Sequence, residues 1–192
     1  GVARDAAILS VDIRGFTPLT RSMTPGQLVR FITEYQARMV PAVVRHGGAI
    51  DKFLGDGLLV TFGALRKSAT CAADALRAID DLMLAAEAWN RERAARGEAP
   101  VRIGAGAASG SVVCGVIGEA GRLEYTVLGD AVNVSAKLES HTKTEAVRAL
   151  VSAALYETAL AQGYEPKDGQ IRLSGRTVGG IEGPMDIVVM AK

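Results

Sequence analysis

Apolar residues recur along the chain with two alternating periods, one typical of buried strands and one typical of amphipathic helices. Residues 6–13 form a short, mostly apolar run, as expected for a buried strand. After Thr24-Pro25, apolar residues return at intervals of three and four until Gly47-Gly48. This spacing predicts a long helix with a threonine cap, in which Pro41 can introduce a kink.

The middle of the chain predicts a hairpin, a second long helix and two further strands. Residues 51–63, "DKFLGDGLLVTFG", contain two apolar runs on either side of a Gly-Asp-Gly turn, which would expose the Asp56 carboxylate at a hairpin tip. An alanine-rich helix is expected over about 68–96. Strands are expected near 101–107 and 111–117, separated by a turn at Ser109-Gly110.

The last third of the chain predicts shorter elements. They are a short strand at Tyr125, helices near 130–140 and 152–162, and closing strands near Ile171 and Ile187. The order of the first elements, βαββαβ, is that of a ferredoxin-like core. The expected fold class is therefore α+β, an α/β sandwich with helices on one face of the sheet and an additional C-terminal helix and strands.

Length and composition indicate one globular domain over 1–192. A chain of 192 residues that is 48% hydrophobic can bury one substantial core, and no linker or repeat divides it. The net charge of +1 and the absence of a long basic run argue against nucleic acid as a partner. The two cysteines, Cys71 and Cys114, lack ligand spacing and are expected to be reduced core thiols.

Two aspartates carry the first chemical signal. Asp12 stands near the end of the first strand, before a glycine turn, and Asp56 stands in the hairpin turn. The expected strand order makes these two strands neighbours. Two adjacent carboxylates suit a hard divalent cation, and Mg²⁺ commonly takes one or two carboxylates together with substrate phosphates. Taken singly, each aspartate is better explained as a strand end or a turn residue. Taken together, with Gly15, Gly55 and Gly57 where the backbone must come close, the two favour a metal site.

Four segments, in order and spacing, resemble the catalytic domain of class III nucleotidyl (adenylyl and guanylyl) cyclases. They are "SVDIRGFT", "DKFLGDGLLVTFG", "VRIGAGAASGSVVCGVIG" and "YTVLGDAVNVSAKLES". The resemblance covers nearly the whole chain. It implies a head-to-tail homodimer with active sites at the interface, each holding two Mg²⁺ or Mn²⁺ ions.

The resemblance also implies roles for individual residues. The implied metal ligands are Asp12, Asp56 and the backbone carbonyl of Ile13. The turn with Gly15, Phe16 and Thr17 would cover the triphosphate, and Arg102 would bind a phosphate group.

By motif position, Lys52 and Thr126 would read the base. Lys52 would serve the site opposite to the one served by Asp56. A lysine only donates hydrogen bonds, which suits N1 of adenine and not the protonated N1 of guanine. The Lys/Thr pair resembles a subgroup of adenylyl cyclases that includes bicarbonate-responsive enzymes. Without the resemblance, Lys52 is an ordinary solvated strand residue and Thr126 an ordinary strand former.

Asn133 and Lys137 lie four residues apart and share one face of a predicted helix. The resemblance implies that Asn133 orients the ribose. Lys137 stands where the family usually has an arginine that stabilises charge on the reacting phosphate. Lysine keeps the charge but lacks the planar fork of arginine. Arg172 and Arg176 are candidates for a second triphosphate cation, with no clear alignment.

The resulting expectation is an adenylyl cyclase that converts ATP to cyclic AMP and pyrophosphate. A guanylyl cyclase and a non-catalytic nucleotide-binding dimerisation module remain as alternatives, the latter because of Lys137. The start at Gly1 suggests a catalytic piece of a longer chain with regulatory domains. The two cysteines, expected to be reduced, indicate a cytoplasmic domain, and membrane attachment of the parent protein is left open.

Overall fold

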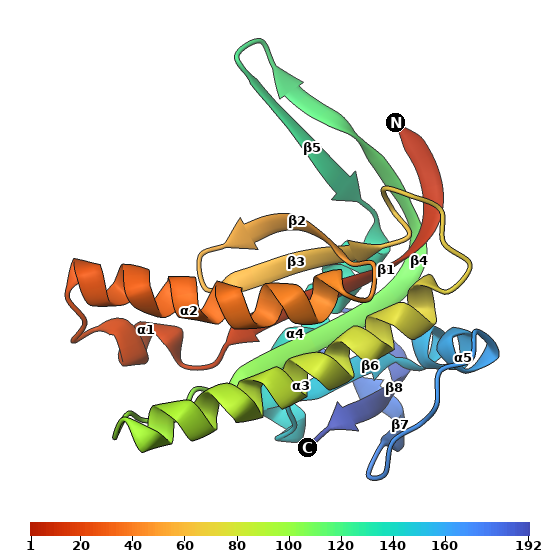
Figure 1. The fold of residues 1–192 in the computed structure, drawn as a ribbon. Coiled ribbons are helices and arrows are strands. Elements are labelled where there is room, and N and C mark those ends of the chain that lie inside the picture. The colour runs from red at the N-terminus through yellow and green to blue at the C-terminus, as the bar shows by residue number, and fades with distance from the viewer.

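The computed structural model describes all residues, 1–192 (Figure 1). The chain forms eight strands and five helices. In order they are β1 (Val2–Ile13), α1 (Phe16–Thr20), α2 (Pro25–Val44), β2 (Ala49–Leu54), β3 (Gly57–Phe62), α3 (Cys71–Ala95), β4 (Ile103–Glu119), β5 (Arg122–Leu128), α4 (Asp130–Glu145), β6 (Ala149–Ser152), α5 (Ala153–Ala161), β7 (Ile171–Thr177) and β8 (Pro184–Ala191).

The strands form one eight-stranded sheet in the order β2-β3-β1-β4-β6-β8-β7, with β5 paired to β4. The elements β1, α2, β2, β3, α3 and β4 give the predicted ferredoxin-like core. β1 lies between β3 and β4 and is antiparallel to both. Val11 pairs with Leu58 and Asp12 pairs with Gly104, so the end of β1 lies beside the tip of the β2–β3 hairpin. The α+β class is confirmed.

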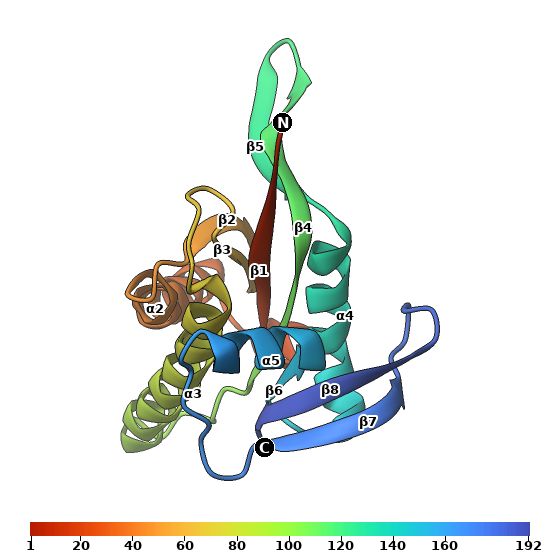
Figure 2. The ribbon, with the colours of Figure 1, turned by 90° about the vertical axis from the view of Figure 1, so that its right-hand side faces the viewer.

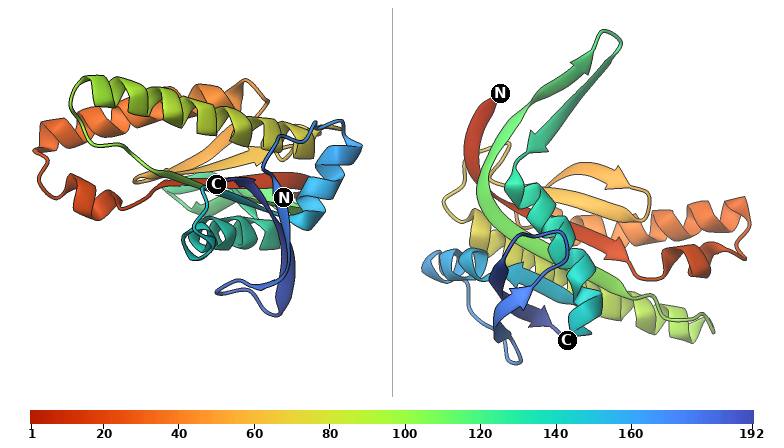
Figure 3. Two further views of the ribbon diagram at one scale, coloured as in Figure 1. Left: turned by 90° about the horizontal axis from the view of Figure 1, so that it is seen from below. Right: turned by 180° about the vertical axis from the view of Figure 1, so that it is seen from behind.

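The two helices of the ferredoxin-like core lie on one face of the sheet, as expected, whereas the additional helix α4 covers the other face (Figure 3). α2, α3 and α5 pack on one face over the main core, which includes Tyr35 and Trp89. α4 lies on the other face, as Figure 3 shows. Gly106 of β4 makes this possible, because a Cβ there would lie 2.1 Å from the backbone nitrogen of Glu139 in α4. The glycines of β4 therefore let a helix approach the second face closely.

The predicted turn at Ser109-Gly110 does not exist, because β4 continues through it. Ser109 pairs with Ala7 and Gly110 with Ala6 in the ladder with β1. The chain reverses instead near Gly121, whose φ of 102° favours glycine. The β4–β5 hairpin then projects far beyond the rest of the molecule (Figures 1 and 2).

Three elements were missed or cut short by the sequence reading. These are α1, the four-residue strand β6, and the last turn of α4, which reaches Glu145 and not residue 140. β6 runs parallel to β4 and joins the C-terminal strands to the core sheet. No helix has the length and apolar composition that crossing a bilayer requires.

Candidate active site

Asp12 and Asp56 lie together at the end of β1, as the strand order predicts. The backbone N–H of Ile13 donates a hydrogen bond to Asp12 Oδ1 over 2.8 Å. The pKa of Asp12 is raised to about 7, first by burial and then by the hydrogen bond and charge of the neighbouring Asp56 carboxyl. Glu139 adds a smaller repulsion. The fold thus brings carboxyl groups together at a cost in electrostatic energy.

This donor set fits a divalent cation. Two carboxyl groups that repel each other gain a favourable partner when a positive ion lies between them. No group of three or more His, Cys, Asp or Glu side chains is arranged to hold a metal. Protein ligands at this place would therefore be two carboxylates and backbone oxygen, the set that Mg²⁺ uses when substrate phosphates complete its shell.

The turn after β1 is fixed to neighbouring segments through Arg14. The Arg14 N–H donates to the carbonyl of Arg102 over 2.7 Å. Its guanidinium donates to the carbonyl of Val147 over 2.7 Å and to the Thr142 hydroxyl. Gly15 follows in the left-handed region with φ 62°. The predicted Phe16 and Thr17 begin α1, with Phe16 packed on the main core and Thr17 exposed.

Lys52 and Thr126, distant in sequence, meet in one chain. Lys52 Nζ lies 3.0 Å from Thr126 Oγ1 and 3.2 Å from Glu124 Oε1. It also lies 3.4 Å from the Asp51 carboxylate. Burial alone would lower the pKa of Lys52, but the hydrogen bonds and charges of Glu124 and Asp51 outweigh it and raise that pKa. The ammonium group is therefore charged and held in place.

Asn133 and Lys137 lie on α4, with Asn133 exposed and Lys137 half-buried. The Lys137 side chain lies across Gly180 in the loop between β7 and β8. A Cβ at Gly180 would be 2.6 Å from Lys137 Cε and 2.9 Å from Nζ. Gly180 also has a φ of 82°, which favours glycine. The Lys137 side chain can therefore pack across this loop only because position 180 has no side chain.

Arg172 and Arg176, the candidates for a second phosphate cation, are engaged elsewhere. Arg172 donates to Glu157 over 2.6 Å and to Asp186 over 3.1 Å. Arg176 Nε lies 3.4 Å from the Glu145 carboxylate. Both arginines lie on β7, the far edge strand of the sheet. Their charges already have acidic partners.

Two residues near the aspartates were missed from the sequence. The Tyr35 hydroxyl is buried without a hydrogen-bond partner, and its pKa is raised by burial first and then by Asp12, Asp56 and Glu139. Glu139 is only 7% exposed, and burial raises its pKa, while Lys143 and Arg14 lower it. Glu139 lies within the quoted "NVSAKLES", two residues after Lys137. Its position on the buried face of the predicted helix was the feature of the sequence that could have identified it.

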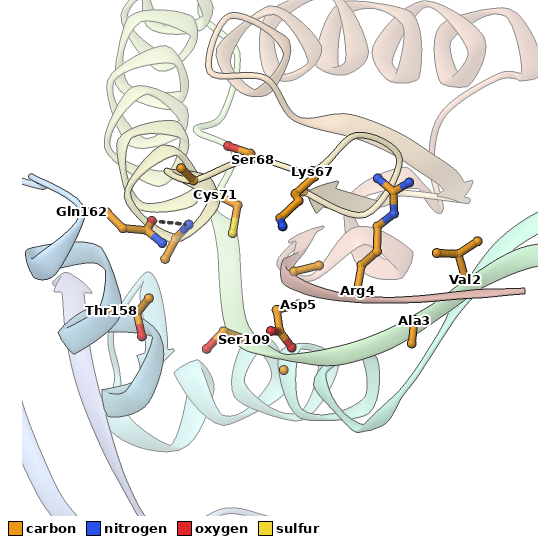
Figure 4. Close-up of a pocket in the computed structure, with 15 residues that line it drawn as sticks. Val2, Ala3, Arg4, Asp5, Lys67, Ser68, Cys71, Ser109, Thr158 and Gln162 are labelled. Atoms are coloured by element: carbon orange, nitrogen blue, oxygen red, sulfur yellow. Dashed lines mark hydrogen bonds between the residues drawn. The ribbon is translucent and has the colours of Figure 1, made fainter.

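The largest cavity of the chain, about 770 Å³, contains none of these residues. Figure 4 shows its lining, with Arg4 and Asp5 from β1, Lys67 from the loop before α3, and Cys71. Both cysteines are free; Cys114 is buried, and burial raises the pKa of Cys71. The predicted site residues therefore lie outside this cavity.

The family description "Adenylate and Guanylate cyclase catalytic domain" matches residues 3–188 of the chain. The chain belongs to this class III nucleotide cyclase family. The expected resemblance is thereby confirmed, and the chemistry of the family is the formation of a cyclic nucleotide by a lyase reaction. The family as a whole includes cyclases of both purine nucleotides.

Curated relatives are longer than this chain. An adenylate cyclase of Anabaena cylindrica is 32% identical over 179 residues, which are 91% of this chain and 34% of the relative. The uncharacterized protein Rv1319c of Mycobacterium tuberculosis is 36% identical over 153 residues, which are 80% of this chain and 27% of the relative. The chain spans about a third or less of the length of these relatives.

Solved cyclase structures share the fold over nearly the whole chain. The guanylyl cyclase Cya2 superimposes with a TM-score of 0.84 at 32% identity and covers 98% of this chain and 92% of its own. The adenylyl cyclase CyaB from P. aeruginosa has a TM-score of 0.80 at 25% identity, covering 100% and 95%. Since the two enzymes differ in nucleotide, the base has to be argued from the residues of this cyclase domain.

Proposed function

We propose that this cyclase domain converts ATP to cyclic AMP and pyrophosphate, at sites shared between two chains of a head-to-tail homodimer. The observation that carries the choice of ATP is the 3.0 Å contact between Lys52 Nζ and Thr126 Oγ1. It places a fixed donor beside a hydroxyl that can accept. The pair is formed by β2 and β5, which approach each other only in the folded chain.

The chemistry of this pair favours adenine. Lys52 can donate to N1 of adenine, whereas N1 of guanine carries a proton and is itself a donor. The Thr126 hydroxyl can accept from the amino group of adenine. Guanine presents a carbonyl oxygen there, which the hydroxyl could meet only by donating. Lys52 is therefore the stronger discriminator of the two.

The remaining predicted residues have separate roles in binding the triphosphate, the ribose and the reacting phosphate. Arg102 and the turn of Gly15, Phe16 and Thr17 bind the triphosphate. Asn133 orients the ribose, and Lys137 stabilises charge on the α-phosphate. These groups act by positioning and electrostatics, because attack of the ribose 3′-hydroxyl needs no protein nucleophile.

The family implies divalent cations, and the carboxylate pair described above fits them. Asp12, Asp56 and the backbone carbonyl of Ile13 would hold two Mg²⁺ or Mn²⁺ ions. When bound, the ions make the ribose 3′-hydroxyl more acidic and neutralise charge on the triphosphate and its leaving group.

A homodimer is supported by the projecting β4–β5 hairpin. Its apolar side chains are unusually exposed, with Leu123 at 71%, Val116 at 62% and Tyr125 at 45%. An isolated apolar hairpin of this kind is prone to pair with another chain. A second copy would cover the hairpin and would complete the proposed sites.

The deciding experiment offers ATP and GTP in parallel to the purified domain, with Mg²⁺ or Mn²⁺, and separates products by chromatography. We expect cyclic AMP as the main product and GTP as a weak substrate. Asp12→Ala is the control and should yield neither product while keeping a native circular dichroism spectrum. A higher kcat/KM for GTP than for ATP would overturn the Lys52 assignment and favour a guanylyl cyclase, the activity of the similar Cya2.

A further inference from the structure

A second hollow, about 410 Å³ in volume, adjoins the turn after β1 and is lined by positive charge. It lies where this turn, the start of β4 and the connection between α4 and β6 meet. No acidic side chain lines it. Its residues are Arg14, Gly15, Arg102, Ile103, Lys143, Ala146, Val147 and Arg148.

The backbone holds the three segments of the hollow together. The Ala105 N–H donates to the Arg148 carbonyl over 2.9 Å, and Arg14 bonds to Val147 from the opposite side. Ala146 ends α4 with a φ of 55°, the single non-glycine residue of the chain with positive φ. A non-glycine residue in this region costs free energy and persists where surrounding contacts require it. The hollow is thus a fixed part of the fold.

Two of the four cations in the hollow form no hydrogen bond or ion pair within the chain, although the charge of one of them, Lys143, lowers the pKa of Glu139. Arg14 is held by Val147 and Thr142, and Arg148 donates to Glu87 over 3.2 Å. Arg102 and Lys143 are exposed, and neither side chain forms a hydrogen bond or an ion pair. The helix dipole stabilises a cation in the last turn of α4, which is a sufficient reason for Lys143 without any ligand. It does not account for Arg102, which comes from another segment and faces the same hollow.

We propose that Lys143, together with Arg102, binds the terminal phosphate groups of the nucleotide and retains pyrophosphate after the reaction. This inference rests on the proposed function. The hollow begins at Gly15, three residues from Asp12, so a triphosphate that lies over the turn extends into it. Free cations from separate elements match a polyphosphate anion, for which lysine acts as a point charge. Lys143 thereby takes the role for which Arg172 and Arg176 were considered.

The test uses Lys143→Gln, which removes the charge at an exposed position. Inorganic pyrophosphate is titrated into the metal-free protein and into the protein with Mg²⁺, and binding is followed by calorimetry. Loss of one charged hydrogen bond should weaken binding by about tenfold or more. In steady-state assays, KM for ATP and the inhibition constant for pyrophosphate should both rise by a similar factor, with a smaller change in kcat. Binding of AMP, which lacks the terminal phosphates, should not change.

Lys67→Gln is the matched control, since it removes an exposed, unpaired lysine that lines the other large cavity. It should leave pyrophosphate binding as in the wild type. Unchanged pyrophosphate affinity in Lys143→Gln, while Arg102→Gln loses it, would overturn the role of Lys143. Pyrophosphate binding that depends on Lys143, in a protein that forms no cyclic product, would refute the proposed function and leave the anion site standing. Cyclase activity together with pyrophosphate inhibition that is the same in Lys143→Gln and in the wild type would refute the anion site and leave the proposed function standing.

Discussion

At the scale of single residues, the proposed metal-holding carboxylates oppose folding when no cation is bound. Burial and the adjacent Asp56 raise the pKa of Asp12 from 3.8 to about 7. The folded state therefore binds this proton more tightly than the unfolded chain does. It follows that the contribution of Asp12 to the free energy of unfolding falls as pH rises from about 4 to about 7.

The first prediction concerns Asp12→Asn, which removes this ionisation. In the presence of a chelator at pH 8, the variant should have a higher Tm than the wild type, and the difference should shrink at pH 5. Cyclase activity should be lost at both pH values. Thermal unfolding followed by circular dichroism measures the effect, and Asp168→Asn, at an exposed turn, should show no such pH-dependent gain. A metal-free wild type that is the more stable protein at pH 8 would contradict the electrostatic argument.

Lys137 allows a second prediction at this scale, because arginine is the usual residue of the family there. A lysine supplies charge without two-point contact to phosphate oxygens. We expect Lys137→Arg to raise kcat with little change in KM, as for an interaction formed mainly in the transition state. Lys137→Ala should lower kcat by about 10² to 10³. Steady-state kinetics with ATP and Mn²⁺ would decide, and equal kcat in all three proteins would exclude a role for Lys137 at the phosphate.

At the scale of elements, the β7–β8 loop and α4 act together through Gly180. A Cβ in Gly180→Ala would collide with Lys137 Cε, so the lysine should be displaced. We predict a lower kcat with nearly unchanged KM, and a loss of about 1 kcal/mol in the free energy of unfolding from backbone strain.

Gly183→Ala separates these two effects of the loop. Gly183 also has a positive φ, of 73°, but no atom lies within 4 Å of its added Cβ. This control should share the loss of stability and keep the wild-type kcat. If Gly180→Ala and Gly183→Ala had the same kcat, strain in the loop and not the position of Lys137 would be responsible.

The helices and strands that the sequence predicted correctly are those with a clear spacing of apolar residues or a clear helix-capping residue. The helix after Thr24 was predicted because its threonine cap, the following Pro25 and its apolar spacing are local signals, and the structure adds a capping box between Thr24 and Gln27. The prediction of a turn at Ser109-Gly110 was wrong. The small residues were taken as the end of a strand, whereas they allow close packing between β4 and α4. The contact between Lys52 and Thr126 was expected only through motif positions. Glu139 and Lys143 were missed because burial and convergence on a hollow are properties of the folded chain.

At the scale of the whole molecule, the proposed function assigns two half-sites to different parts of the surface of one chain. Asp12 and Asp56 lie at the end of β1, whereas Lys52 and Thr126 meet between β2 and β5. In a symmetric dimer, each residue of an interface is present twice and faces a different residue of the partner. Two chains arranged head to tail would thus form two complete sites, each using the aspartates of one chain and the base-reading pair of the other.

This arrangement gives the final prediction, which uses two inactive variants. Asp12→Ala removes a metal ligand from one half-site, and Asn133→Ala removes the proposed ribose contact from the other. In a mixed dimer, the intact Asp12 of one chain faces the intact Asn133 of its partner, so one of the two sites is complete. Random exchange makes about half of the dimers mixed, and activity should recover to about a quarter of the wild-type value.

Exchange has to be shown directly, by co-purification of differently tagged chains, so that a negative result can be interpreted. Mixing Asp12→Ala with Asp56→Ala is the matched control. Both changes damage the same half-site, so every mixed dimer lacks one proposed metal ligand in each of its two sites, and no recovery is expected. Recovery in neither mixture, despite proven exchange, would mean that Asp12 and Asn133 act within one chain. The exposed β4–β5 hairpin would then need an explanation other than a shared active site.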